Sequence, residues 1–203
     1  MSQNKWDKRY SGEEYMYGEE PNVYLKEKLG ALPQGEILFA AEGEGRNAVF
    51  AAKSGWKVKA FDSSKIAKEK AEKLAERNQV QIEYSVINAE EVDFPKERFD
   101  ALVLIYAHFP QNRHSIHQRL ASFVKPGGYL ILEAFNKDHV SNQQQNPKAG
   151  GPKDIEMLYD LEELKSDFKD FDFVELENKQ IVLKEGEHHV GKADVIRILG
   201  VKR

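Results

Sequence analysis

The sequence contains no cysteine, which excludes disulfides, cysteine nucleophiles and zinc sites built on cysteine. It also lacks an excess of positive charge, because 30 Lys and Arg residues stand against 34 Asp and Glu residues, for a formal net charge of -4. This balance argues against nucleic acid as the main partner. No apolar stretch approaches the roughly 20 residues that span a membrane, and residues 1–7 do not resemble a signal peptide. We therefore expect a cytoplasmic protein with neither a membrane nor a nucleic-acid partner.

The apolar pattern predicts alternating strands and helices. At 203 residues we expect one domain, 1–203, with a flanking helix or lid in 1–35 and the core in 36–203. Strands are expected at 37–41, 57–61, 80–86, 101–105, 128–135, 173–183 and 193–201, and helices at 22–32, 47–54, 64–78 and 112–124. This order predicts an α/β fold, a Rossmann-like open sheet of about seven strands, mostly parallel with a C-terminal antiparallel hairpin and helices on both faces. The polar, breaker-rich segment 141–152 is expected to be a mobile loop.

Ligands of such sheets bind beyond the carboxyl ends of the strands, which selects residues 41–46, 62–64, 88–90 and 106–110. Residues 43–48 have G-x-G-x-x-A spacing between a strand and a helix, and Asp62 follows 19 residues after Gly43. This spacing fits NAD as well as S-adenosylmethionine. The acidic Glu42 and Glu44 oppose a pyrophosphate and tolerate the cationic S-adenosylmethionine. The alternatives are a glycine turn that serves packing alone and an Asp62 that caps the following helix.

Several segments together resemble one family. Residues 37–47 resemble the first motif of class I S-adenosylmethionine-dependent methyltransferases, especially the tellurite-resistance and thiopurine-methyltransferase-like branch. The similarity continues in residues 6–10, 17–22, 99–110, 125–128, 150–154 and 189–192, and so covers nearly the whole chain. Three positions depart from the family pattern, since Phe39 replaces an acid, Ala41 a glycine and Asn88 an aspartate.

The resemblance implies S-adenosylmethionine as the cofactor. The implied contacts to its methionine part are Ala41, Glu42, Gly43 and Gly45, and those to its ribose are Asp62 and Ser63. The implied contacts to its adenine are Asn88, Ala89 and Glu90, and those beside its sulfonium are Ile105 and Tyr106. Because the usual acid is missing at Phe39, we expect Glu42 to supply the counter-charge for the methionine ammonium. The amide oxygen of Asn88 can still accept a hydrogen bond from the adenine amino group.

The acceptor side rests on four candidate residues. His108 is a candidate general base or acceptor-orienting donor, because it follows a buried strand and imidazole titrates near neutral pH; the alternative is a loop histidine bonded to backbone. Arg113 is a candidate clamp for an anionic acceptor, or an ordinary arginine at a helix start. Tyr17 and His189 are candidates for the acceptor pocket, and the alternatives are aromatic packing and a solvated hairpin tip.

These residues predict direct, in-line methyl transfer to a small molecule, with a soft anionic acceptor of the tellurite, selenite or thiol type as the leading choice. A soft anion needs no base, whereas a protonated acceptor does. A non-catalytic S-adenosylmethionine-binding regulator and an NAD-dependent oxidoreductase are the alternatives. His114 and His117 lack an identified third ligand, so no metal is expected. We expect a monomer or weak homodimer.

Overall fold

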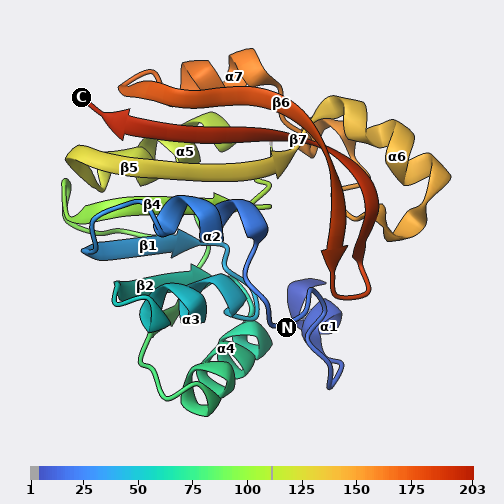
Figure 1. Cartoon of the computed structure of the whole chain (residues 1–203), viewed down its shortest axis with the longest axis horizontal. Coiled ribbons are helices and arrows are strands. Elements are labelled where there is room, and N and C mark those ends of the chain that lie inside the picture. The colour runs from blue at the N-terminus through green and yellow to red at the C-terminus, as the bar shows by residue number, and fades with distance from the viewer. Residues whose placement is uncertain (1–4, 111) are drawn as a thin grey trace.

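The computed structural model describes residues 5–110 and 112–203. Its strands are β1 (Glu36–Ala40), β2 (Lys57–Asp62), β3 (Glu83–Val86), β4 (Phe99–Ile105), β5 (Val124–Phe135), β6 (Phe171–Glu185) and β7 (His189–Lys202). They form one sheet in the order β3-β2-β1-β4-β5-β7-β6 (Figure 1). The first five strands pair in parallel, and β7 and β6 join antiparallel. The predicted fold class is confirmed.

Helices cover both faces of this sheet (Figure 1). They are α1 (Lys5–Tyr10), α2 (Val23–Leu29), α3 (Arg46–Lys53), α4 (Lys65–Arg77), α5 (Arg113–Ser122), α6 (Val140–Gln145) and α7 (Leu161–Asp167), with short 3-10 turns η1 (Lys137–His139), η2 (Pro147–Ala149) and η3 (Ile155–Met157). The predicted caps are present, because Asn22 accepts a hydrogen bond from the Leu25 amide and Ser64 accepts one from the Ala67 amide. Across residues 5–110 and 112–203, no helix has the length and apolar character needed to cross a membrane.

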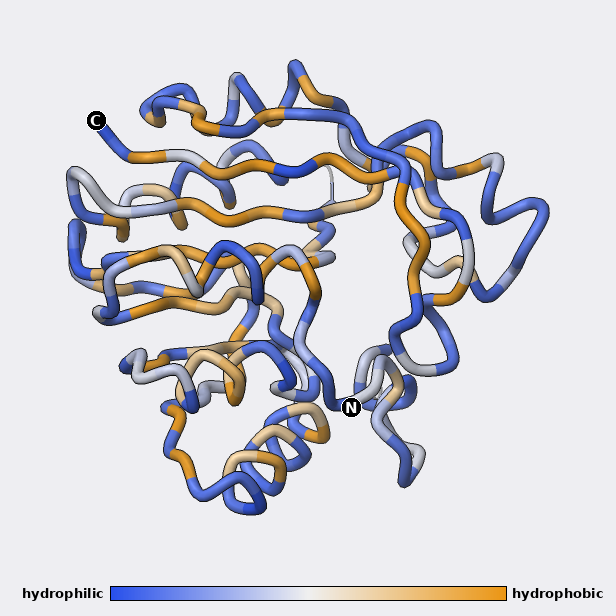
Figure 2. Tube along the Cα trace, viewed as in Figure 1, coloured by the Kyte–Doolittle hydropathy of each residue, from blue (hydrophilic) through white to orange (hydrophobic). Residues whose placement is uncertain are grey.

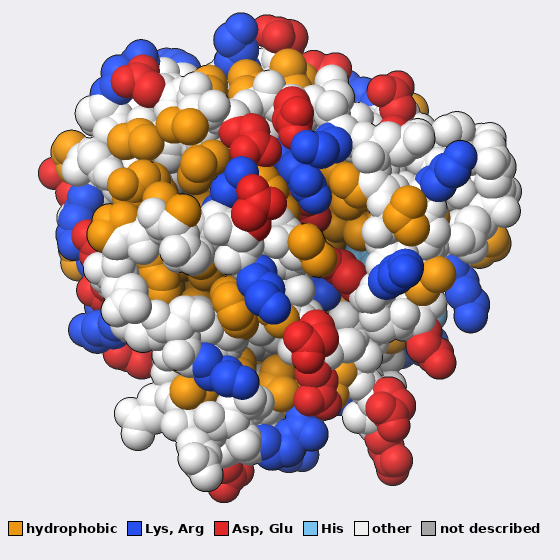
Figure 3. Space-filling view, viewed as in Figure 1, with side chains coloured by type: hydrophobic (Ala, Val, Ile, Leu, Met, Phe, Trp, Pro, Cys, Tyr) orange, Lys and Arg blue, Asp and Glu red, His pale blue; other side chains and the backbone are white. Residues whose placement is uncertain are grey.

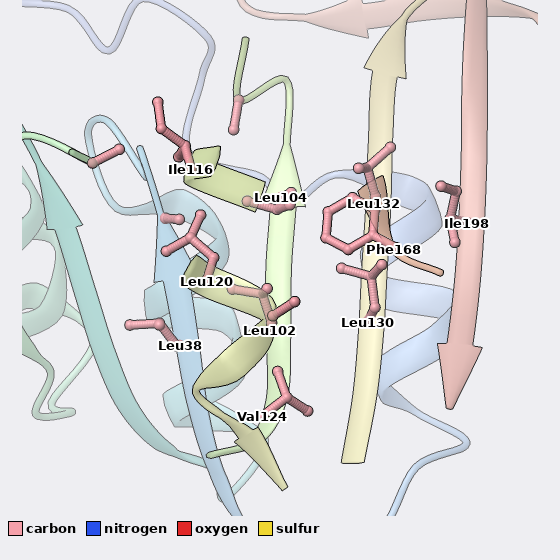
Figure 4. Packing of buried hydrophobic residues seen from close by; sticks show 14 of the residues in the cluster. Leu38, Leu102, Leu104, Ile116, Leu120, Val124, Leu130, Leu132, Phe168 and Ile198 are labelled. Carbon is pink, nitrogen blue, oxygen red and sulfur yellow. The ribbon is translucent and has the colours of Figure 1, made fainter. Parts of the chain in front are cut away.

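The core follows from the alternation of side chains along the central strands. In β1, Leu38 faces a cluster shared with α5 and α7, whereas Ile37 and Phe39 face the cluster shared with α2 and α3. Both sheet faces are therefore apolar, and the strands appear as hydrophobic runs in the chain trace (Figure 2). Leu102 and Leu130 belong to the first of these clusters, and Figure 4 shows how its side chains pack together. Phe39, which replaces an acid of the family motif, is thus fully buried on the α2 and α3 side.

Two predicted boundaries were wrong. The strand expected from Val80 begins only at Glu83, because the Val80 amide still donates to the Ala75 carbonyl at the end of α4. The strand expected from residue 128 begins at Val124 and contains a bulge, since Phe99 pairs with Val124 but Ala101 pairs with Tyr129.

The segment 141–152, which was expected to be a mobile loop, contains helical structure instead. The segment forms most of α6 and all of η2, and Ala149 is fully buried. Its amide side chains satisfy backbone groups, because Asn146 donates to the Val190 carbonyl and Gln143 donates to the carbonyls of Gly150 and Pro152. Composition alone cannot distinguish such internal hydrogen bonding from solvation.

The C-terminal hairpin extends past the rest of the sheet. The pairing of β5 with β7 ends at Phe135 and Val195, so residues 180–194, which we call the hairpin arm, pair only with each other. The arm bends toward α1 and brings its turn against the N-terminal segment (Figure 1). A Cβ built on Gly186 would approach the Met16 carbonyl oxygen to 2.5 Å. The two ends of the domain therefore meet above the carboxyl edge of the sheet.

Candidate active site

The carboxyl ends of the central strands bring together most of the sequence-predicted cofactor residues. The strand order places Asp62 at the end of β2, the glycine turn after β1 and Tyr106 after β4, in that sequence along one edge. Ala41 and Tyr106 both have left-handed backbones, with φ of 51° and 52°. Strained backbone at neighbouring strand ends is typical of a functional site.

Asp62 organises the ribose side of this edge. Its Oδ2 accepts a hydrogen bond of 3.0 Å from the Gly43 amide, and its Oδ1 accepts one of 2.9 Å from the Ser64 amide. The side chain is nearly buried, and burial raises the pKa of Asp62 above its ordinary value. The Ser63 amide also bonds to this carboxylate, and an ionised carboxylate has about four lone-pair sites, so Asp62 can accept a ribose hydroxyl without giving up these bonds.

The two glycines of the turn serve different purposes. Gly43 has φ of 68°, and a Cβ built on it would lie 2.9 Å from the Tyr10 hydroxyl oxygen. Gly45 has φ of 90°, and a Cβ there would lie 2.5 Å from the Ala71 Cβ of α4. Gly43 therefore permits the close approach of Tyr10 to the turn, and Gly45 permits close packing of the turn on α4.

The two acidic residues of the turn point away from each other. Glu42 Oε1 accepts hydrogen bonds of 3.0 and 2.8 Å from the amides of Asn47 and Ala48 at the start of α3. Glu44 is buried, accepts a hydrogen bond from the Met16 amide and forms a 2.7 Å ion pair with Lys70. Glu44 is thus neutralised by α4. Of the two acids in the turn, Glu42 therefore remains the candidate counter-charge for the methionine ammonium.

The pKa of Glu42 gives a testable pH dependence. Burial raises its pKa from 4.5 to about 7, although the α3 amides and Arg46 oppose that rise. Since the folded state then binds a proton more tightly than the unfolded state, stability falls as pH rises from about 4.5 through 7. We expect the difference in free energy of unfolding, wild type minus Glu42→Gln, to fall by roughly 1–3 kcal/mol from pH 5 to pH 8. Urea unfolding at both pH values measures this, and parallel profiles would contradict the assignment.

Ala41 offers a second stability test. Its left-handed backbone explains why the resembled family uses glycine here, because a non-glycine residue in this region is disfavoured by roughly 1–2 kcal/mol. Glycine adds about 0.5–1 kcal/mol of unfolded-state entropy, so we expect Ala41→Gly to stabilise the fold by about 0.5–1 kcal/mol net. Denaturant unfolding measures the change, and a loss above 1 kcal/mol would show that the Ala41 methyl makes essential contacts.

The predicted adenine residues lie at the exposed side of the edge. Asn88 and Glu90 are exposed and Ala89 is nearly buried. Asn88 begins a turn, because its carbonyl accepts from the amides of Glu91 and Val92. Ser63 lies between Asp62 and the start of α4. Their roles toward a cofactor stay predictions.

A buried carboxylate that the sequence reasoning missed lies behind the methyl end. Glu133 of β5 is 1% exposed, and its Oε1 accepts hydrogen bonds of 2.7 Å from both the side-chain Nδ2 of Asn22 and the Tyr106 hydroxyl. Its Oε2 accepts a 2.6 Å hydrogen bond from Arg197 Nε. Glu133 therefore fixes the Tyr106 side chain and ties β4, β5, β7 and the start of α2 together. A charged residue inside an otherwise apolar strand was the available signal.

Arg46 connects the glycine turn with both ends of the chain. It is nearly buried, forms a 2.9 Å ion pair with Glu185 of the hairpin arm and donates to the carbonyls of Tyr17 and Glu20. Glu185 also accepts a 3.1 Å hydrogen bond from His189 Nδ1. The Arg46 guanidinium holds the pKa of Glu185 near 2 despite burial. Arg46 is therefore committed to a carboxylate and is not available for a phosphate.

The structure does not support His108 as a base. Its Nδ1 is 2.9 Å from the Met157 carbonyl oxygen, and its Nε2 accepts from the Phe135 amide at 3.3 Å. A carbonyl accepts and an amide donates, so Nδ1 carries the proton and both ring nitrogens are occupied. Burial lowers the pKa of His108 to about 3. The alternative of a backbone-bonded loop histidine describes this geometry.

The remaining candidates on α5 are structural. Arg113 donates to the Glu156 carbonyl at 2.6 Å and to Glu163 at 2.5 Å, so it holds α5 against η3 and α7 and does not clamp an acceptor. His114 and His117 both hydrogen-bond to Asp167 of α7. In the part of the chain that the structure describes, no three His, Cys, Asp or Glu side chains group as a metal site.

The N-terminal segment covers the cofactor edge; residues 1–4 of the predicted lid lie outside the described residues. Tyr10 is 5% exposed beside Gly43, and Asp7 accepts hydrogen bonds from Ser64 and the Ile66 amide at the start of α4. Tyr17 packs its ring 4.3 Å from that of His189. The segment therefore joins α4 to the hairpin arm above the site, and its role as a lid stays a prediction.

Comparison with known proteins relates part of the chain to a family. Residues 37–128, slightly less than half of the chain, match the family model described as a methyltransferase domain. The matched residues include the glycine turn, Asp62 and Tyr106, so the family match covers the edge described above.

The similar proteins include named methyltransferases. The ubiquinone biosynthesis O-methyltransferase of Alkalilimnicola ehrlichii is 33% identical over 118 residues, which are 57% of this chain and 47% of that protein. The chain thus spans about half the length of this curated relative. TehB of Haemophilus influenzae has a TM-score of 0.73 at 17% identity, covering 98% of this chain and 66% of that one. A SAM-dependent methyltransferase of Methanosarcina mazei has a TM-score of 0.69 at 21% identity, covering 90% and 98%.

The residues present fit S-adenosylmethionine. Asp62 keeps acceptor capacity for a ribose hydroxyl, and Gly43 presents bare backbone next to it. S-adenosylmethionine is the cofactor of this domain class, and the predicted edge has the chemistry to hold it.

Proposed function

We propose that the protein is a methyltransferase that moves a methyl group from S-adenosylmethionine directly to a small molecule. The observation that carries the choice of cofactor is the position of Glu42. Its carboxylate already binds the amides at the start of α3, where a dinucleotide enzyme would bind pyrophosphate. A pyrophosphate there would meet a site that the Glu42 side chain already fills, which disfavours NAD.

The residues of the chain act by positioning. S-adenosylmethionine supplies a methyl group already activated by a sulfonium. Asp62 would hold the ribose, and Tyr106, fixed by Glu133, would border the sulfonium. The N-terminal segment and hairpin arm would exclude water from the acceptor. Near-attack positioning can supply roughly 7–11 kcal/mol, so no strong electrophile has to be created. With no cysteine, a relay through a protein thiol is excluded, and transfer is direct.

A soft anionic acceptor of the tellurite, selenite or thiol type is the acceptor class that we propose. Arg9 supports it, because its exposed guanidinium lies over the Tyr17 ring at 5.8 Å and donates to the Tyr17 hydroxyl. No carboxylate among the described residues lies within ion-pair distance of Arg9. An exposed cation beside the lid favours the approach of an anion.

Calorimetry followed by an acceptor screen tests this function. We expect binding of S-adenosylmethionine and none of NAD, then transfer of labelled methyl to members of a panel of thiols, selenite, tellurite, phenols and amines. Tight binding of NAD alone would overturn the proposal. Cofactor binding without turnover on any acceptor would favour the alternative, a regulator that senses S-adenosylmethionine. Glu42→Gln with unchanged affinity for S-adenosylmethionine would contradict the role of Glu42 as partner of the methionine ammonium.

A further inference from the structure

His189 is a buried histidine whose ring is held from several sides. It is 4% exposed, and its ring centroid lies 4.3 Å from that of Tyr17, 4.6 Å from that of Tyr106 and 5.3 Å from that of Phe135. These contacts come from the N-terminal segment, the end of β4 and the end of β5. The ring therefore has a fixed orientation at the point where lid, sheet and hairpin arm meet.

The hydrogen bond to Glu185 fixes which ring nitrogen carries the proton. Glu185 is ionised, because Arg46 holds its pKa near 2, and a carboxylate can only accept. His189 Nδ1, 3.1 Å from Glu185 Oε2, is therefore the protonated nitrogen, and Nε2 has a free lone pair. Burial lowers the pKa of His189 below its ordinary value, so the ring is neutral near pH 7. The titratable and charged groups around it are Glu185, Arg46, Arg9, Tyr17, Tyr106 and His108.

The Nε2 edge of His189 faces a glycine. A Cβ built on Gly150 would lie 2.8 Å from His189 Nε2, so any other residue there would cover this edge. Within residues 5–110 and 112–203, no hydrogen bond to Nε2 is formed. His108 differs, because backbone groups occupy both of its ring nitrogens. Of these two histidines near Phe135, His189 alone can accept a proton without breaking a hydrogen bond.

The strand order puts His189 on the acceptor side. Asp62 at the end of β2 marks the ribose, and Tyr106 at the end of β4 marks the methyl end of the cofactor. Phe135, which His189 contacts, lies one strand further along the same edge, on β5. His189 is therefore beyond the methyl end, on the side opposite the ribose, where an in-line acceptor must approach.

We propose that His189 is the general base of the reaction, oriented by Glu185, and that the acceptor is a thiol that enters with its proton. This inference rests on the proposed function and names its acceptor as a thiol that binds in the neutral S–H form and becomes the soft nucleophile only as His189 takes its proton. The S–H proton moves to His189 Nε2 as the acceptor sulfur forms its bond to the methyl carbon. The carbon–sulfonium bond breaks and its electron pair stays on the departing thioether. Glu185 stabilises the resulting imidazolium, which releases its proton to water after product leaves.

Two thiols of different acidity test the base. At pH 7 a nitro-substituted aryl thiol is already ionised, whereas an alkyl thiol keeps its proton. His189→Asn retains a donor toward Glu185 but has no basic nitrogen. We expect it to lower kcat/KM for the alkyl thiol by roughly 10²–10⁴-fold and to change that for the aryl thiol by less than about threefold. His188→Asn, at the exposed neighbouring position, is the control and should leave both rates unchanged.

Binding and spectroscopic readouts separate the possible failures. Calorimetry should give the same affinity for S-adenosylmethionine in His189→Asn and wild type. Nitrogen-15 NMR of the wild-type protein should show His189 as the Nδ1–H tautomer, and an Nε2–H tautomer would overturn the proposal even if the variant does not fold. Equal rate losses for both thiols, or none, would also overturn it. If wild type binds the cofactor and methylates neither thiol, the thiol-type acceptor itself is wrong.

Discussion

Asp62→Ala is expected to weaken the binding of S-adenosylmethionine by about 100-fold or more. A hydrogen bond to a charged group contributes roughly 1.5–3 kcal/mol, so loss of the bond between Asp62 and a ribose hydroxyl reaches about 100-fold at the upper end of this range. The variant also releases the Gly43 amide, which loosens the turn beside the methionine end. Calorimetric titration measures the loss, and thermal unfolding of the same sample establishes that the fold is kept.

Two further variants make this result specific to the site. Asp62→Asn keeps one carbonyl oxygen and should bind with intermediate affinity. Asp172→Ala removes an exposed carboxylate that pairs with Arg203 at 3.2 Å, and it should bind as wild type does. Affinity of Asp62→Ala within threefold of wild type would show that the ribose is held elsewhere.

Glu133→Ala is expected to destabilise the protein by about 3–5 kcal/mol. The change leaves the Arg197 guanidinium, 13% exposed, without the carboxylate that faces it at 2.6 Å, and an uncompensated buried charge has a cost of this size. Asn22 and the Tyr106 hydroxyl lose the same acceptor. Urea unfolding at neutral pH measures the effect, and the left-handed Tyr106 should become less ordered.

Matched variants distinguish a buried charge from general damage. Glu177→Ala removes a half-exposed carboxylate that pairs with Lys179 at 2.9 Å, and we expect a loss of less than about 1 kcal/mol. Replacing Glu133 by Leu together with Arg197 by Met should recover much of the stability lost in Glu133→Ala, since no charge is then left unpaired. A Glu133→Ala protein as stable as Glu177→Ala would contradict the assignment.

The side chains near the surface are mixed in charge, and this bears on the acceptor. Acidic and basic groups alternate over the face in Figure 3. The overall balance of -4 therefore gives no single-sign field that would select a partner. We therefore expect local groups to select the acceptor, and Arg9 of the N-terminal segment and His189 of the hairpin arm are two such groups.

Prediction from sequence was right about the position of residues where position follows the backbone alone. The glycine turn and Asp62 occupy strand ends, and spacing alone brings strand ends to one edge, while their roles toward a cofactor stay predictions. Prediction failed for His108, whose position after β4 was right but whose ring nitrogens bond to backbone of β5 and η3. It missed Glu133, although a charged residue inside an apolar strand was a signal, and it missed Glu185, because pairing with the distant Arg46 has no short-range sequence signal.

The sequence by itself determined the α/β order, the glycine turn with its acid 19 residues later, and the absence of any cysteine chemistry, because these depend on local periodicity and residue type. Only the tertiary structure decided which charges act on a ligand and which are already satisfied. Glu44 pairs with Lys70, Arg46 with Glu185, and His189 takes its tautomer from that same Glu185, 139 residues along the chain from Arg46. A proton's position depends on the nearest acceptor in space, and folding is what sets that neighbour.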